Sequence, residues 1–330
     1  MRLHQTITTA AAGLLALSAC GSGVSADDTA DTASRTVESC GESVNIDGVP
    51  EAVVGLYPSQ TEMLLRLGLG DRLVGQAQVG AARLPEDIAD EATDVPTLSE
   101  DTPPSREDLL AAEPDFVFSP TTYEFSEDQG FASTDQLADA GAAAYVATGG
   151  CFDRRMTGTV DDLFTDLETL GTVFAVEDEA AELIDQSQTE LDRVESAIDG
   201  VDRLTVAQVF VEGSTLSAIG GGVEFDMLQR AGAEPVFSPD DDAFAEFFAA
   251  QITPEELANR EPEALVFAVD SDEAEQSTRE YLRTTFPDLP AVREDRLIAI
   301  ETADTMPGTL GNVEVVTQVA EALYPEAFEE

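Results

Sequence analysis

The sequence contains no lysine and no tryptophan, and its only histidine is His4. All 16 basic residues are arginines, against 67 aspartates and glutamates, which gives a formal net charge of −51. A chain this acidic repels nucleic acid and anionic lipid headgroups, so neither is an expected partner. Because the acidic residues are spread along the whole chain, the charge is typical of a solvated surface in a salty medium, where ions screen the self-repulsion.

The near absence of histidine also restricts the chemistry. His4 lies in a segment with the layout of an export signal, so the mature chain is expected to carry no imidazole. That excludes a Ser-His-Asp triad and a histidine-based zinc or manganese site. Five tyrosines are few for a bare ferric site, and the lack of tryptophan disfavours stacking on a flat macrocycle. We expect no metal site and no cofactor.

The amino terminus indicates export. Arg2 and His4 precede an apolar run over residues 7–17, which is too short to span a bilayer. Small residues then lead to Cys20, as in a bacterial lipobox. We therefore expect residues 1–19 to be removed and Cys20 to be lipidated, which would anchor the protein outside the cytoplasm on the cell membrane. An ordinary signal peptide with a chance cysteine is the alternative.

Two cysteines remain in the mature chain, Cys40 and Cys151. Export places them in an oxidising compartment, where an even pair favours a disulfide; two separate buried thiols are the alternative. A bridge would close a loop of about 111 residues and stabilise the fold by roughly 4–5 kcal/mol on the chain-entropy argument.

The rest of the chain alternates between strand and helix patterns. Residues 21–39 are polar and lack apolar periodicity, which predicts a flexible tether. After residue 50, short apolar runs alternate with amphipathic stretches, which predicts parallel α/β sheets. The expected strands are residues 52–56, 73–76, 116–119, 144–147, 204–211, 264–268 and 297–300. The expected helices include residues 61–67, 106–112, 160–174, 224–231, 254–259, 275–284 and 313–323.

One long helix is expected at residues 178–198, where apolar side chains recur near helical spacing. At 1.5 Å per residue it would be roughly 31 Å long and stiff, so it would hold two lobes at a nearly fixed angle with a preformed cleft between them. The predicted fold is two Rossmann-like α/β lobes joined by this helix, with the ligand cleft between the lobes. The predicted boundaries are signal peptide 1–19, tether and start of fold 20–49, N-terminal lobe 50–176, interlobe helix 177–200 and C-terminal lobe 201–330.

Five motifs carry a family resemblance. Residues 53–62 read VVGLYPSQTE, 67–75 LGLGDRLVG, 108–117 DLLAAEPDFV, 253–266 TPEELANREPEALV and 289–297 LPAVREDRL. Their order and spacing resemble the iron-chelate and cobalamin substrate-binding proteins of ABC importers. The resemblance implies a monomeric binding protein, not an enzyme, that captures a ferric siderophore and delivers it to an ABC permease. Cobalamin or heme is the alternative ligand. A rival class, an exported carboxylate-based hydrolase, would need a close acidic pair that no spacing singles out.

The family's permease contacts are one exposed glutamate on each lobe, paired with arginines of the permease. Residue by residue, these positions match Glu62 and Glu255. Helix capping is the alternative interpretation of both. Ser59 and Glu62 have the spacing of a capping box, and Thr253 and Glu256 form a second one, which would leave Glu255 free to point outward.

Ligands of open α/β sheets bind beyond the carboxyl ends of the strands. Arg154 and Arg155 stand together there, and an arginine fork suits the oxygens of an anionic chelate; pairing with nearby acidic residues is the alternative. Residues 220–222, three glycines, predict a tight turn bordering the cleft rather than a phosphate loop. The expected ligand-binding residues are Tyr57, Arg83, Tyr123, Arg154, Arg155, Phe225 and Met306, and Glu212, Phe237 and Phe244 are further side chains that these loops offer.

Overall fold

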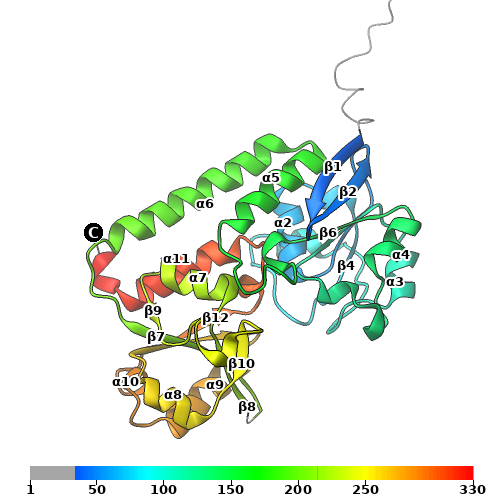
Figure 1. Cartoon of the computed structure of the whole chain (residues 1–330). Coiled ribbons are helices and arrows are strands. Elements are labelled where there is room, and N and C mark those ends of the chain that lie inside the picture. The colour runs from blue at the N-terminus through cyan, green and yellow to red at the C-terminus, as the bar shows by residue number, and fades with distance from the viewer. Residues whose placement is uncertain (1–33, 214, 330) are drawn as a thin grey trace, which may run out of the picture.

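The computed structural model describes residues 34–213 and 215–329. The predicted signal peptide at residues 1–19 and the lipidation site Cys20 lie outside these residues. Figure 1 shows two lobes side by side, with one long helix running along both of them. The predicted α/β class is confirmed, since each lobe is built around its own sheet of largely parallel strands.

The sheet of the first lobe has four parallel strands in the order β4-β3-β5-β6. All residues of β5 and β6 are buried, as expected for parallel strands whose two faces are both covered. Helices α2, α3 and α4 connect successive strands, and α5 follows the last strand and leads to α6 (Glu177–Ala197). The strands are β3 (Val53–Gly55), β4 (Leu73–Gln76), β5 (Phe116–Ser119) and β6 (Ala143–Val146), and the helices are α2 (Pro58–Arg66), α3 (Arg106–Ala111), α4 (Thr134–Asp139) and α5 (Asp162–Phe174).

The sheet of the second lobe has six strands, with β10-β8-β7-β11-β12 in order and β9 paired to β7. The predicted strands β7, β11 and β12 are parallel, whereas β8 joins them antiparallel. The sequence prediction did not include β8, β9 or β10. Strands β9 and β10 are only two and three residues long, which is too short for a recognisable pattern. The strands are β7 (Thr205–Glu212), β8 (Thr215–Ile219), β9 (Glu234–Pro235), β10 (Ala249–Gln251), β11 (Ala264–Val269) and β12 (Leu297–Glu301).

Helices α7 (Gly222–Arg230), α8 (Pro254–Arg260), α9 (Asp272–Thr285), α10 (Pro290–Arg293) and α11 (Gly311–Leu323) complete the second lobe. Within the described part of the chain, none of the helices is both long enough and apolar enough to cross a bilayer.

The long helix α6 (Glu177–Ala197) is close to the predicted range 178–198. It packs on α5 of the first lobe and on α11 of the second, so it touches a helix of each lobe. Gly171 of α5 makes the α5–α6 approach possible, because a Cβ atom there would lie 2.8 Å from the Cβ of Ala180. One apolar cluster continues from Phe116 in the first sheet through Val194 in α6 to Val266 in the second sheet. This shared core favours a fixed angle between the lobes.

The prediction of a tether up to residue 39 is wrong, because a hairpin begins at Ser34. Its strands are β1 (Ser34–Ser39) and β2 (Glu42–Asp47), and Cys40 turns the chain with a positive φ of 51°. The hairpin buries few apolar side chains, so its sequence resembles a polar linker. Tertiary contacts hold it instead.

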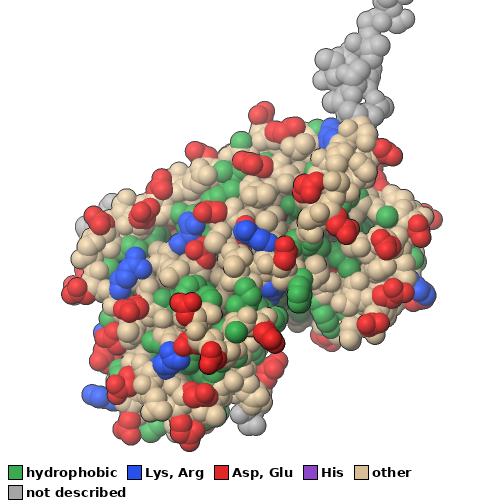
Figure 2. All heavy atoms as spheres, in the orientation of Figure 1, with side chains coloured by type: hydrophobic (Ala, Val, Ile, Leu, Met, Phe, Trp, Pro, Cys, Tyr) green, Lys and Arg blue, Asp and Glu red, His purple; other side chains and the backbone are tan. Residues whose placement is uncertain are grey.

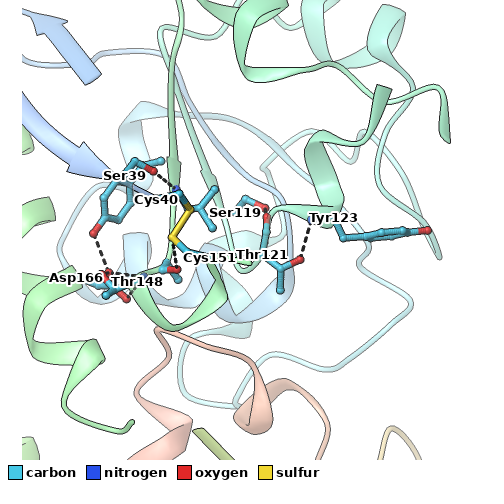
Figure 3. Close-up of a disulfide and its surroundings, with 11 residues drawn as sticks. Ser39, Cys40, Ser119, Thr121, Tyr123, Thr148, Cys151 and Asp166 are labelled. Carbon is cyan, nitrogen blue, oxygen red and sulfur yellow. Dashed lines mark hydrogen bonds between the residues drawn. A yellow bond between two sulfur atoms is a disulfide. The ribbon is translucent and has the colours of Figure 1, made fainter. Parts of the chain in front are cut away.

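The predicted disulfide between Cys40 and Cys151 is present, and it joins the hairpin turn to the loop that follows β6 (Figure 3). Next to it, the N–H of Val146 donates to Oγ of Ser39 at 3.0 Å. The hairpin is therefore fastened to the carboxyl end of β6, where the loops toward the second lobe begin.

Candidate ligand cleft between the lobes

The surface is hollowed where the two lobes meet, and apolar side chains gather around the hollow (Figure 2). Among the described residues, three large apolar side chains are exposed: Tyr123 at 52%, Phe152 at 83% and Phe247 at 51%. Tyr123 and Phe152 belong to loops after β5 and β6, and Phe247 lies just before β10 in the other lobe. Exposed aromatic side chains on loops of both lobes are typical of a ligand-binding wall.

The loop between β6 and α5, residues 147–161, reaches across to the second lobe. The carbonyl oxygen of Met156 accepts a hydrogen bond from the N–H of Gly222 at 3.0 Å. Gly222 has a φ of 71°, and a Cβ atom there would lie 2.5 Å from the carbonyl oxygen of Arg155, so only glycine permits this approach. A Cβ atom at Gly220 would likewise lie 2.5 Å from the ring of Phe244. Gly222 thus lets the two lobes meet closely, whereas Gly220 makes room for Phe244 within the second lobe.

Arg155 lies at this meeting point. Its guanidinium carbon is 4.2 Å from the ring centroid of Phe248, which belongs to the second lobe. Burial lowers the pKa of Arg155, while the negative charges of Glu224 and Glu124 act in the opposite direction. An arginine nevertheless stays protonated, so this side chain brings a fixed positive charge to the seam.

Two carboxyl groups, one from each lobe, face that charge. Both hydroxyls of Ser119 and Thr121 donate to Oε2 of the buried Glu124, at 3.2 and 2.6 Å. Burial raises the pKa of Glu124 in spite of these hydrogen bonds. In the second lobe, Gln208 donates to Oε1 of Glu224 at 2.7 Å, and burial raises the pKa of Glu224 to about 7 against the effects of Arg155 and Gln208. Sequence analysis named neither glutamate, since nothing local distinguishes them from the other acidic residues.

Tyr57 and Met306 meet across the lobes. Tyr57 is buried and packs with Ala82 and Ala303, and Met306 lies against the same cluster. Burial raises the pKa of the Tyr57 hydroxyl to about 12, with smaller contributions from Glu124 and Asp270. These side chains form the apolar contact at the base of the seam. A contact of Tyr57 or Met306 with ligand stays a prediction.

Arg154 and Arg155 have separate partners, and the alternative interpretation, pairing with a nearby acidic residue, applies to Arg154. Arg154 forms an ion pair with Asp162 at the start of α5. Asp162 also accepts from the N–H of Thr159 at 2.9 Å, so this pair organises the end of the loop. Arg83 instead forms an exposed ion pair across the lobes, with its Nη2 3.4 Å from Oδ1 of Asp272. Arg155 is therefore the arginine among the predicted three that faces the two cleft glutamates.

Two further candidates belong to the core. Phe237 and Phe244 are buried with their ring centroids 5.7 Å apart, so the suggestion that they line the cleft is wrong. The apolar character that made them look like ligand contacts serves the packing of the second lobe. Glu212 is exposed at the end of β7, and Phe225 is half-buried in the first turn of α7. Their contact with ligand stays a prediction.

The two expected docking glutamates differ in their surroundings. The prediction of an exposed Glu62 is wrong, since its side chain is 5% exposed and its Oε1 lies 3.2 Å from Nε of Arg66. Burial raises the pKa of Glu62 to about 7, opposed by Arg66. The capping interpretation is also wrong for this glutamate, because α2 begins at Pro58 without a side-chain cap.

Glu255 is exposed in the first turn of α8. The capping box predicted beside it is formed, with the N–H of Glu256 donating to Oγ1 of Thr253 at 3.2 Å and the N–H of Thr253 donating to Oε2 of Glu256 at 2.6 Å. Glu256 performs the capping, and Glu255 is left facing solvent.

Two α/β lobes, a long helix that packs on both, and an aromatic-rimmed hollow between them define a two-lobed solute-binding protein. Residues 53–303 match the periplasmic binding protein family, and the chain belongs to that family. Its members are the substrate-binding proteins of ABC importers, which are not enzymes.

Similar proteins agree with this assignment. An uncharacterized ABC transporter substrate-binding lipoprotein of Bacillus subtilis, YvrC, is 23% identical over 294 residues, which is 88% of this chain and 85% of that protein. A periplasmic binding protein from Veillonella parvula shares the fold with a TM-score of 0.77 and 20% identity, covering 88% of this chain and 98% of that one. An ABC-type Fe3+-hydroxamate transport protein from Saccharomonospora viridis also shares the fold, with a TM-score of 0.72 and 24% identity, covering 88% of this chain and 98% of that one.

Proposed function

We propose that this protein captures a ferric siderophore outside the membrane and delivers it to an ABC permease. The observation that carries the proposal is the seam between the lobes, where Arg155 stacks on Phe248 and the neighbouring Phe247 is exposed. Tyr123 and Phe152 are exposed on the first-lobe loops that follow β5 and β6. Aromatic side chains suit the apolar arms of a chelator, and a guanidinium suits the partly negative oxygens around the iron. The fold shared with the Fe3+-hydroxamate transport protein supports the same ligand class.

The location and the partner follow from this role. The protein would be held on the outer face of the cell membrane through lipid on Cys20, as a monomer, and the Cys40–Cys151 bridge suits an oxidising compartment. Glu255 has the exposure that a contact with a permease arginine requires. Glu62 would first have to leave Arg66, so the proposed contact of this chain rests on Glu255.

The test is a binding titration with the purified mature chain, using ferric hydroxamates, ferric catecholates, heme and cobalamin. Tight binding of a ferric chelate is expected, with a loss of ten-fold or more in the double variant Phe152→Ala, Phe247→Ala and in Arg155→Ala. Phe328→Ala, a half-buried phenylalanine beside Arg193 on α6, is the matched control and should bind normally. Tight binding of cobalamin or heme without response to any ferric chelate would contradict the siderophore proposal and favour the alternative ligand.

A further inference from the structure

The charges at the seam between the lobes do not balance. The Arg155 backbone approaches Gly222 at the start of α7, the helix that carries Glu224. The negative charges of Glu224 and Glu124 both act on the single guanidinium of Arg155, although neither forms an ion pair with it among the described residues. The neighbouring arginines do not compensate, because Arg154 is paired with Asp162 and Arg83 with Asp272. Asp270 lies near the Tyr57 hydroxyl at the same seam and adds a further negative charge. A ligand that enters here meets an excess of negative charge around a single positive one.

We propose that the cleft selects ferric chelates that carry a positively charged amino group over chelates that are neutral or anionic, and that Glu124 and Glu224 determine this preference. The inference rests on the proposed siderophore-binding function and adds the charge of the ligand. It differs from the expectation from the sequence that an arginine at the cleft suits an anionic or neutral ferric chelate.

The geometry supports separate roles for the two kinds of charge. Arg155 stacks on Phe248 and can donate hydrogen bonds to the oxygens that surround the iron. Glu224 uses Oε1 to accept from Gln208, and its Oε2 has no hydrogen-bond donor among the described residues, so that oxygen can accept from an ammonium group. The exposed ring of Phe247 next to Phe248 also attracts a cation through its π face.

Whether affinity rises or falls with pH should depend on the charge of the ligand. Burial raises the pKa of Glu224 to about 7, so this carboxyl group is partly protonated near neutrality in the free protein. A bound cation favours the ionised form, so affinity for a cationic chelate should rise between pH 6 and pH 8. An anionic chelate should bind less tightly over the same range. Glu124 and Arg155 face the same site, and arginine does not titrate there.

The experiment uses one ferric trihydroxamate in three forms, with its terminal amine free, acetylated or succinylated. The iron coordination is the same in all three, whereas the terminal group is positive, neutral or negative. Dissociation constants are measured with the full mature chain at several salt concentrations, because salt screens the overall charge of the protein more than contacts inside the cleft. We expect the amine form to bind at least ten-fold more tightly than the acetylated form, and the succinylated form to bind weakest.

Glu224→Gln and Glu124→Gln identify the source of the preference. Each variant keeps the side-chain shape, and each should lower affinity for the amine form about ten-fold while leaving the acetylated form unchanged. Glu255→Gln, an exposed acidic residue on α8, is the matched control. Arg155→Ala should weaken all three forms together, and thermal unfolding of every variant confirms that it is folded.

The outcomes separate the two proposals. If all three forms bind equally, or if the succinylated form binds most tightly, the charge preference is overturned while the siderophore-binding function stands. If the Gln variants weaken all three forms equally, the glutamates do not determine selectivity, and that part is overturned. If none of the three forms binds and catecholate, heme or cobalamin binds instead, both the proposed function and this inference fail.

Discussion

The two sides of the junction between the lobes are built in opposite ways. On the helical side, α6 covers a continuous apolar core, and its one arginine, Arg193, pairs with Glu190 and Glu321, both at 2.8 Å. On the cleft side, aromatic side chains are exposed, and the charges of two carboxyl groups act on Arg155. The helical side buries its apolar groups and so gains stability. The cleft side leaves aromatic surface exposed to solvent, which is the expected arrangement of a binding site.

The largest expected effect comes from removing apolar volume on the helical side. Phe174 at the end of α5 is buried against Phe116, with ring centroids 5.1 Å apart. Phe174→Ala should lower the free energy of unfolding by about 3–5 kcal/mol through the cavity that it leaves. Chelate affinity should stay unchanged while the variant is folded. Urea unfolding followed by circular dichroism gives the stability.

The matched substitution on the cleft side is Phe152→Ala, whose side chain is 83% exposed. It should leave the unfolding free energy within about 0.5 kcal/mol of the parent, as surface substitutions usually do, and should weaken ligand binding. A large loss of stability in this variant would mean that the cleft side also contributes to folding, contrary to the proposed difference between the two sides.

The disulfide should affect both properties. Replacing Cys40 and Cys151 together with serine should lower the free energy of unfolding by about 2–5 kcal/mol, because the unfolded chain gains freedom. Chelate affinity should fall as well, since the bridge holds the loop that carries Phe152 and Arg155 (Figure 3). Titration and urea unfolding of the double variant measure the two effects. Unchanged affinity would mean that the contact of Met156 with Gly222 is enough to hold the loop.

Buried carboxyl groups should make the protein more stable at pH 5 than at pH 8. Asp166 accepts from the Tyr145 hydroxyl at 2.7 Å, and burial raises its pKa to about 7. Because its pKa in the unfolded chain is about 3.9, the folded state holds more protons between those values, and stability falls as the pH rises through them. Asp166→Asn should reduce this fall by about 1–2 kcal/mol in unfolding measured across the range.

Glu255→Gln, at an exposed position, should leave the pH dependence as it is. The same pH dependence in Asp166→Asn as in the parent protein would contradict the prediction, because Asp166 would then not contribute to the fall in stability.

The smallest expected effect comes from the exposed ion pairs of α6. Arg193→Ala should change the free energy of unfolding by less than about 1 kcal/mol, since exposed ion pairs contribute little. Affinity for chelate should not change. Arg155→Ala is the contrasting substitution, with a clear loss of affinity on titration. If Arg193→Ala weakened binding as much as Arg155→Ala, the functional contrast between the two arginines would be lost.

Much of the fold could be predicted because its strands are short buried apolar runs. The predicted strands at residues 73–76 and 116–119 have the same bounds as β4 and β5, and α6 differs from its predicted range by one residue at each end. The hairpin of β1 and β2 could not be found in this way, since its exposed faces are polar and its support comes from Cys151 and Val146. Elements with a buried apolar pattern can be predicted from the local sequence, whereas elements held by distant contacts cannot.

The candidate site was predicted less well than the fold. Arg155, Tyr123 and Met306 lie where the sequence placed them in loops, but Arg154 pairs with Asp162. Glu62 looked like an exposed family contact and is buried beside Arg66. In a chain with 67 acidic residues, local pattern cannot tell a carboxyl group at the surface from one in a cleft.

The sequence by itself determined the α/β class, the long helix and the pair of cysteines that form the bridge. These three features depend on residue type and on the spacing of residues along the chain, and both can be read directly from the sequence. Only the tertiary structure brought Arg155 onto Phe248 of the other lobe, where the charges of Glu124 and Glu224 act on it. Burial and opposing charges set their pKa values, and both arise from atoms that are distant in sequence and close in space.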